Sequence, residues 1–122
     1  MIENIINNKE NMFFLIAGPC VIENEYETYE IAERILEISK RLDVPFIFKA
    51  SYKKANRTKI DSFTGLGDLK GLEILQKISR NLEIPVTTDV HTKEEVLTAS
   101  KYVQMIQIPA FLCRQTEILT QS

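Results

Sequence analysis

Four short apolar runs, each followed by a segment with helical spacing or turn residues, limit what this 122-residue chain can fold into. The runs are expected to be strands and cover residues 12–17, 45–50, 84–89 and 103–108. They are nearly continuous in apolar residues, which is typical of strands that are buried on both faces. Strands that alternate with helices along the chain form parallel sheets, so the sequence predicts an α/β fold.

Helix signals separate the runs. Asn24, with Glu27 three residues on, resembles a capping box, and apolar residues then recur at helical spacing at Ile31, Ile35, Ile38 and Leu42. Asp68 is a candidate cap for a second helix with the stripe Leu72, Leu75, Ile78 and Leu82. The segment 92–95 is a capping box for a short third helix, and a fourth is expected from Arg114 onward.

Two parallel architectures fit this order: an open, doubly wound sheet or half of a closed (β/α)8 barrel. A barrel takes about 250 residues, so this chain cannot close one alone. We expect a single partial domain over residues 1–122, with a polar leader at 1–11. In both architectures the functional groups lie at the carboxyl ends of the strands. Those ends carry Cys20, the segment 49–57, Asp89 with His91, and Gln107 with Arg114.

Composition excludes several classes of protein. A net charge of −2 and the lack of aromatic residues among the clustered cations argue against nucleic acid as a partner. No apolar run approaches the roughly 20 residues that cross a bilayer. The opening residues lack the basic and apolar regions of a secretory signal, so a cytoplasmic location is expected. The two cysteines, Cys20 and Cys113, are expected to be reduced thiols.

The densest chemical feature is the set of cations Lys49, Lys53, Lys54 and Arg57. Like charges this close repel one another unless anions lie between them, and phosphate suits both lysine and arginine. A solvated basic loop is the alternative. Lys49 differs from the others because it directly follows the buried run PFIF, where lysine is rare without a role.

These residues also carry a family resemblance. The strings AGPCVIE, FKASYKKANRT, DSFTGLG, TTDVH and IQIPAFLCRQT are similar to those of the 3-deoxy-D-manno-octulosonate-8-phosphate synthases. The sister 3-deoxy-D-arabino-heptulosonate-7-phosphate synthases share the GPC and TD strings. They usually have Lys-Pro-Arg-Thr where this chain has the segment 54–57, which favours the octulosonate enzymes.

The resemblance implies a (β/α)8 barrel of which this chain supplies about the first four units. It implies a transferase of lipopolysaccharide sugar biosynthesis that condenses phosphoenolpyruvate with arabinose 5-phosphate and releases phosphate. Lys49, Lys54 and Asp89 would act at the reacting centre. Substrate binding would fall to Asn56, Arg57, Thr58, Gln107, Ala110 and Arg114. Arg114 would reach a neighbouring subunit, which implies a homo-oligomer, expected to be a tetramer.

The same resemblance makes Cys20 a candidate metal ligand, because metal-requiring members have cysteine there and metal-free members have asparagine. A thiolate favours borderline or soft divalent metals such as zinc or iron(II), but one thiolate is not a metal site. For the full-length enzyme the resemblance implies zinc, iron or manganese. The resemblance places the other ligands outside these residues, and we expect the fragment alone to be inactive. His91 is expected to be a positioned structural group.

Two alternatives stay open: the sister synthase, acting on erythrose 4-phosphate, and a non-catalytic module that binds a phosphorylated ligand.

Overall fold

The computed structural model describes residues 13–52 and 66–108, in which strands and helices alternate. The strands are β1 (Leu15–Ala17), β2 (Phe46–Lys49), β3 (Val86–Asp89) and β4 (Met105–Gln107). The helices are α2 (Glu25–Arg41), α3 (Leu66–Leu82) and α4 (Lys93–Ala99). The strands are shorter than the predicted apolar runs but lie within them. The expected fourth helix from Arg114 lies outside the described residues.

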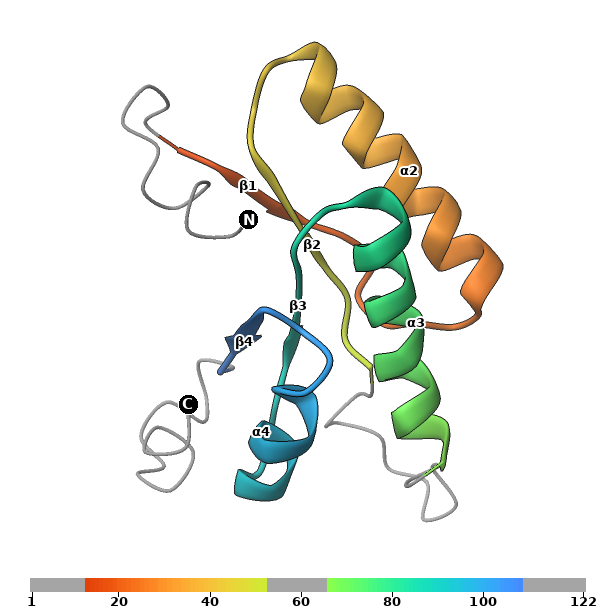
Figure 1. Cartoon of the computed structure of the whole chain (residues 1–122), viewed down its shortest axis with the longest axis vertical. Coiled ribbons are helices and arrows are strands. Elements are labelled where there is room, and N and C mark those ends of the chain that lie inside the picture. Colours follow the sequence, from red (N-terminus) through yellow and green to blue (C-terminus); the bar gives the residue numbers. More distant parts are fainter. Residues whose placement is uncertain (1–12, 53–65, 109–122) are drawn as a thin grey trace.

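The four strands form one parallel sheet in the order β1-β2-β3-β4 (Figure 1). Each strand therefore pairs with the next one in sequence, through a helical crossover. A doubly wound sheet would place β1 inside the sheet instead. The observed order confirms the prediction of consecutive β/α units of the barrel type.

The helix starts follow two of the three predicted caps. Asn24 accepts a hydrogen bond through Oδ1 from the Glu27 backbone N–H at 2.8 Å, and Thr92 accepts one through Oγ1 from the Glu95 N–H at 3.2 Å. The prediction for Asp68 was wrong, because α3 already begins at Leu66 and Asp68 lies in its first turn. An acid is also favourable there, beside the positive end of the helix dipole, so its identity could not distinguish cap from first turn.

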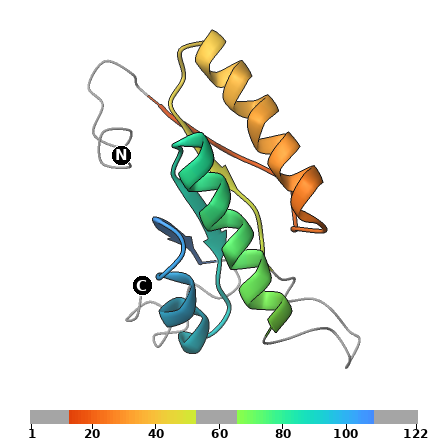
Figure 2. The same ribbon diagram turned by 45° about the vertical axis from the view of Figure 1, so that its right-hand side comes forward.

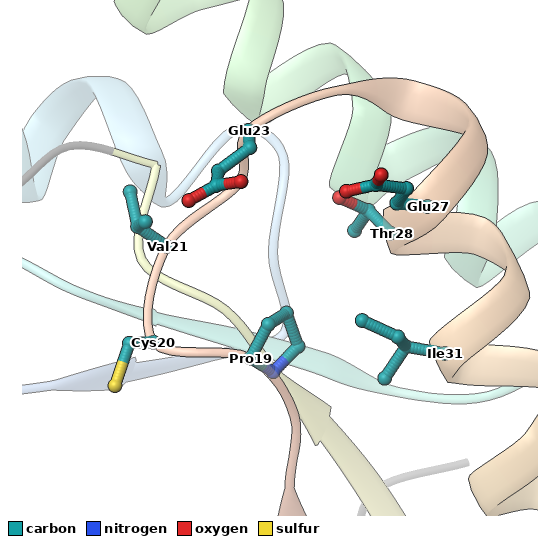
Figure 3. A pocket seen from close by; sticks show the side chains of 7 residues that line it. All are labelled: Pro19, Cys20, Val21, Glu23, Glu27, Thr28 and Ile31. Atoms are coloured by element: carbon teal, nitrogen blue, oxygen red, sulfur yellow. The ribbon is translucent and has the colours of Figure 1, made fainter.

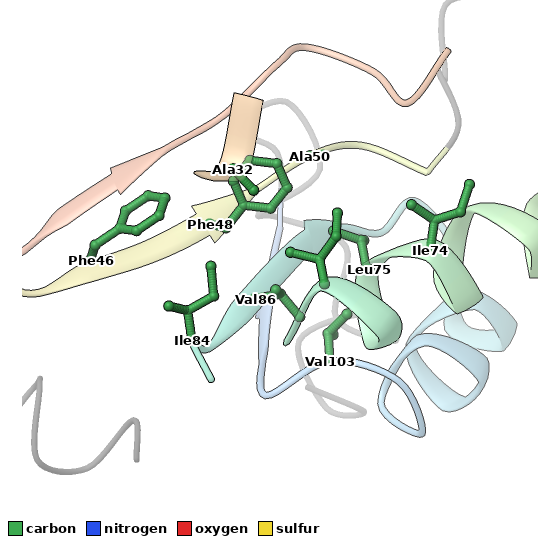
Figure 4. Close-up of a cluster of buried hydrophobic side chains, with 10 residues drawn as sticks. Ala32, Phe46, Phe48, Ala50, Ile74, Leu75, Ile84, Val86 and Val103 are labelled. Atoms are coloured by element: carbon green, nitrogen blue, oxygen red, sulfur yellow. The ribbon is translucent and has the colours of Figure 1, made fainter. Parts of the chain in front are cut away.

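The main core lies between the sheet and helices α2 and α3, which pack beside each other (Figures 1 and 2). Phe46 and Phe48 point from β2 into this layer, with ring centroids 6.2 Å apart in an edge-to-face arrangement. The helices add Ala32, Ile74, Leu75 and Ile78, and Val86 completes the layer from β3 (Figure 4). The predicted stripe on α3 is buried as far as Ile78, with Leu82 half-buried, so periodicity gave its orientation correctly.

The stripe on α2 behaves differently. Its buried residues are Thr28, Ala32 and Ser39. Of the predicted stripe only Ile35 is half-buried against the core, whereas Ile31, Ile38 and Leu42 are exposed. Strand β1 is also open, since Leu15 is 37% and Ile16 is 43% exposed although they point to opposite faces. The β1–α2 side thus presents apolar groups that neither β2 nor α3 covers. Within the described ranges, no helix is long and apolar enough to cross a membrane.

We predict that residues 1–122 expressed alone do not unfold cooperatively. Each leucine-sized side chain left in water forgoes about 1.5–3 kcal/mol, against a domain stability of about 5–15 kcal/mol. Strand β1 is also an edge of the described sheet, and an unpaired edge invites association with other chains. Thermal unfolding followed by circular dichroism, with binding of a hydrophobic dye, measures this. A sharp transition from a monomer that does not bind the dye would contradict the prediction.

Candidate functional site

Three of the predicted site residues end neighbouring strands. Lys49 is the last residue of β2, Asp89 of β3 and Gln107 of β4. Lys49 pairs with Thr87, two residues before Asp89, and Asp89 pairs with Gln107. Side chains alternate along a strand, so Lys49 faces away from the helix-facing Phe48, and Asp89 is in phase with it. All three side chains therefore share one face and one rim, the carboxyl end, as the sequence predicted.

The loop after β1 is held tightly against the end of β2. A Cβ at Gly18 would lie 1.6 Å from the Lys49 carbonyl oxygen, so only glycine fits there. Three residues on, Val21 forms a parallel bridge with Ser51, and the Ile22 N–H donates to the Ser51 carbonyl oxygen at 2.9 Å. These backbone contacts bring the loop that carries Cys20 to the same rim as Lys49.

The remaining predicted site residues lie outside the described residues. They are Lys54, Asn56, Arg57, Thr58, Ala110 and Arg114. Their proposed roles come from the sequence alone. The described rim consists of Cys20, Lys49, Asp89, Gln107 and the neighbours that hold them.

Asp89 belongs to a polar cluster at the end of β3. Its Oδ2 lies 3.4 Å from His91 Nε2, and His91 Nδ1 lies 3.4 Å from Glu95 Oε1. The Tyr52 hydroxyl donates to the same Glu95 oxygen at 3.0 Å. Asp89 Oδ1 is buried and has no hydrogen-bond partner among the described residues. A buried carboxylate oxygen left unpaired is costly, so Oδ1 needs a partner from outside the described residues.

Sequence reasoning identified His91 as a positioned group but missed Tyr52 and Glu95. The sequence pattern assigns Glu95 only to the capping box at the start of a helix. The predicted capping box was a usable signal, because a glutamate at the third helical position folds back toward the residues before the helix, of which His91 is one. Nothing in the sequence indicated that Tyr52, which precedes Lys53 in the basic segment, would meet the same glutamate.

Cys20 is exposed and lines a hollow of about 270 Å³ between the loop after β1 and the first turns of α2. Glu23 and Glu27 also line it, but the Cys20 sulfur points away from Glu27 (Figure 3). No three His, Cys, Asp or Glu side chains in the described part of the chain come together to hold a metal ion. Cys20 thus offers one donor, where three or four are needed.

The pKa values of Glu25 and Lys77 are shifted, and both residues lie away from this rim. Glu25 and Lys77 form an ion pair at 2.8 Å between α2 and α3, on the helical surface. The hydrogen bond and the opposite charge lower the pKa of Glu25 and raise the pKa of Lys77. Any stability that Glu25 gains from the pair is present above its ordinary pKa and is lost as pH falls through the lowered value. Both side chains are exposed, so we assign the pair no role in the site.

Comparison with known proteins agrees with this geometry. The family model described as the DAHP synthetase I family matches residues 1–122. The chain belongs to this family. Its four consecutive parallel strands are the corresponding part of the family's (β/α)8 barrel.

Curated relatives carry a more specific name. A 2-dehydro-3-deoxyphosphooctonate aldolase of Desulfatibacillum aliphaticivorans is 59% identical over 106 residues, which is 87% of this chain and 39% of that protein. Proteins of the same name from Paracidovorax citrulli and Geobacter metallireducens are 55% and 52% identical, each over 88% of this chain. The chain spans about two fifths of the length of the curated relatives it matches.

The close approach at Gly18 can be tested in a chimaera, in which this chain replaces the matched segment of the Desulfatibacillum relative. We predict that Gly18→Ala lowers the free energy of unfolding by about 3 kcal/mol, because the new methyl group must displace the β2 backbone. Thermal and denaturant unfolding measure the change. Gly71→Ala is the comparison: its Cβ would lie 3.0 Å from Tyr52 Cβ and 3.3 Å from the Tyr52 backbone, a milder crowding that should cost less than Gly18→Ala. Equal stability of the parent and Gly18→Ala would contradict the prediction.

Proposed function

We propose that the complete protein containing this chain condenses phosphoenolpyruvate with arabinose 5-phosphate, giving 3-deoxy-D-manno-octulosonate 8-phosphate and phosphate. One observation carries the proposal: Lys49, Asp89 and Gln107 share a face and a rim, in a chain more than half identical to relatives named for the octulosonate product. The name of those relatives favours this reaction over the sister reaction on erythrose 4-phosphate.

The reaction needs two phosphorylated substrates held side by side. The enol carbon of phosphoenolpyruvate attacks the sugar aldehyde, and the neighbouring carbon becomes electron-poor. Water adds to that carbon, and phosphate leaves as the carbon–oxygen bond breaks. Several negative charges must lie close together throughout, so fixed cations and hydrogen-bond donors both orient the substrates and lower the barrier.

Lys49 supplies such a cation from a rigid position. It is half-buried at the end of β2, and its backbone is packed against Gly18. An ammonium group held this way loses little entropy on binding an anion. Asp89 is two residues further toward the rim on β3, with Oδ1 unpartnered in the described structure. We assign Oδ1 to a sugar hydroxyl. Gln107, paired with Asp89 and exposed, would line the phosphoenolpyruvate pocket.

The remaining parts of the proposal rest on the sequence. Lys54 would act with Lys49, and Asn56, Arg57 and Thr58 would bind the sugar phosphate. Ala110 would line the phosphoenolpyruvate pocket through its backbone, and Arg114 would reach a substrate phosphate across a subunit interface. This last assignment implies a homo-oligomer. We also propose a cytoplasmic location, where phosphorylated sugars are made and used.

We also propose that the complete protein binds a divalent metal ion with Cys20 as one ligand. The described residues fit this only as a single donor, so the other ligands must come from outside them. Such an ion would add positive charge beside the substrates. Lys49, Asp89 and Gln107 keep the roles given above with or without it.

The chimaera defined above tests the reaction. We expect it to release phosphate from phosphoenolpyruvate with arabinose 5-phosphate, and at least about tenfold less with erythrose 4-phosphate. Lys49→Ala and Asp89→Ala should each lower kcat by roughly 10²–10³, as the loss of a preorganised charge does at other active sites. Lys101→Ala, an exposed lysine in the turn before β4, is the matched control and should keep parental activity.

The outcomes separate the alternatives. Preference for erythrose 4-phosphate would favour the sister synthase. A folded chimaera that binds phosphoenolpyruvate but turns over neither sugar would favour a binding module. If Lys49→Ala and Asp89→Ala were as active as Lys101→Ala, the assignment of the rim would be wrong even with the reaction confirmed.

The metal proposal has its own test. We predict that the dialysed chimaera retains a divalent ion and that Cys20→Ser lowers the bound metal at least about tenfold, because a hydroxyl is a poorer anionic ligand than a thiolate. Metal content per chain is measured by emission spectrometry. Cys113→Ser is the matched control and should retain the ion. Equal metal content in parent and Cys20→Ser would place Cys20 outside the metal site.

A further inference from the structure

Glu95, near the rim, makes contacts through both of its carboxylate oxygens. Its Oε1 accepts from the Tyr52 hydroxyl at 3.0 Å and from the His91 backbone N–H at 3.3 Å, and lies 3.4 Å from His91 Nδ1. Its Oε2 accepts from the Thr92 hydroxyl at 3.1 Å. The side chain is only 12% exposed. Contacts to both carboxylate oxygens, from the end of β2, the end of β3 and the start of α4, fix its position.

The partner from β2 is itself held rigidly. Tyr52 is buried, its backbone N–H donates to Thr88 Oγ1 at 3.3 Å, and α3 passes so close that a Cβ at Gly71 would lie 3.0 Å from Tyr52 Cβ. A hydroxyl on a ring fixed in this way restricts the glutamate it bonds. Glu95 is therefore tied to the framework of the sheet as well as to its own helix.

The His91 ring is the link between Glu95 and Asp89. One ring nitrogen lies 3.4 Å from Glu95 Oε1 and the other 3.4 Å from Asp89 Oδ2, and the His91 side chain is 10% exposed. At 3.4 Å these are electrostatic contacts, in which either carboxylate attracts a ring nitrogen that carries a proton. The ring thus lies between the two carboxylates, so moving Glu95 is expected to move the ring and Asp89 with it.

We propose that Glu95 is a positioning residue for the proposed reaction: through His91 it holds Asp89 so that Oδ1 faces the substrate at the rim. The inference rests on the function proposed above. A role limited to starting α4 would need only the two contacts with Thr92 and the bond that Oε1 accepts from the His91 backbone N–H. The Tyr52 hydroxyl and the His91 ring beside Oε1 go beyond that role. Glu95 itself need not touch the substrate.

The kinetic test compares Glu95→Ala with Glu94→Ala in the chimaera. Glu94 carries the same charge in the same turn of α4 and is exposed, so its removal should change kcat less than twofold. Glu95→Ala should lower kcat on the order of tenfold, since a small misplacement of a catalytic group is costly. Glu95→Gln should recover most of the rate, because an amide oxygen can take the place of Oε1. Equal rates in Glu95→Ala and Glu94→Ala would overturn the proposal.

A double-mutant cycle separates positioning from a general structural role. If Glu95 acts through His91, adding Glu95→Ala to His91→Asn should lower kcat by less than about twofold further, because the link is already broken. A merely structural glutamate would give its full loss in both backgrounds, and that additive result would overturn the proposal. Tyr52→Phe, which removes one donor to Oε1, should give a smaller loss in the same direction and serves if Glu95→Ala does not fold.

A crystal structure of the Glu95→Ala or Tyr52→Phe chimaera gives a readout that does not depend on turnover. The distance from His91 Nε2 to Asp89 Oδ2 should increase beyond about 4 Å, outside ion-pair range. An unchanged 3.4 Å separation would overturn the positioning role. A parent chimaera without activity would count against the proposed reaction only, because the ring position still tests the inference about Glu95.

Discussion

Parallel pairing of each strand with the next one in sequence is the constraint on which the site depends. Every helical crossover returns the chain to the same edge of the sheet, so the carboxyl ends of all four strands lie at the opposite rim. The register then decides which side chains meet: Lys49 pairs with Thr87, and Asp89 pairs with Gln107. A slip of one residue would turn these side chains to the helix-covered face. The packing of Phe46, Phe48 and Val86 against α2 and α3 prevents that slip.

Two kinds of contact hold the residues of the rim in place. Backbone contacts fix its first half, since Gly18 lies against Lys49 and Val21 bridges to Ser51. Side-chain contacts fix its second half, through Tyr52, Glu95 and His91 around Asp89. The open apolar side of β1 and α2 has no such support within the described residues. The described part of the chain therefore has fixed side chains at the carboxyl ends of its strands and an exposed apolar surface at β1 and α2.

Most of the fold was predictable, for physical reasons that differ between elements. The strands were found because nearly continuous apolar runs leave a strong signal, although only β2 and β3 are mostly buried in the described structure. Helix α3 was found because its buried stripe keeps helical spacing to Ile78. The stripe on α2 misled, because Ile31, Ile38 and Leu42 are apolar but exposed, while Thr28 and Ser39 are buried. Periodicity shows which residues share a face of a helix but not which neighbour covers that face. The start of α3 failed for a similar reason, since an acid suits both cap and first turn.

The element pattern left two strand orders open, and only the family resemblance favoured the one observed. The sequence by itself determined the α/β class and the placement of Cys20, Lys49, Asp89 and Gln107 at strand ends. Those features depend on local composition and on the order of elements along the chain, which a linear pattern records. Only the tertiary structure decided that Tyr52, His91 and Glu95 converge on Asp89, and that Gly18 must lack a side chain. Tyr52 and Glu95 lie 43 positions apart in the chain and on different elements. Their contact arises from strand register and helix packing, and no short segment of sequence contains that information.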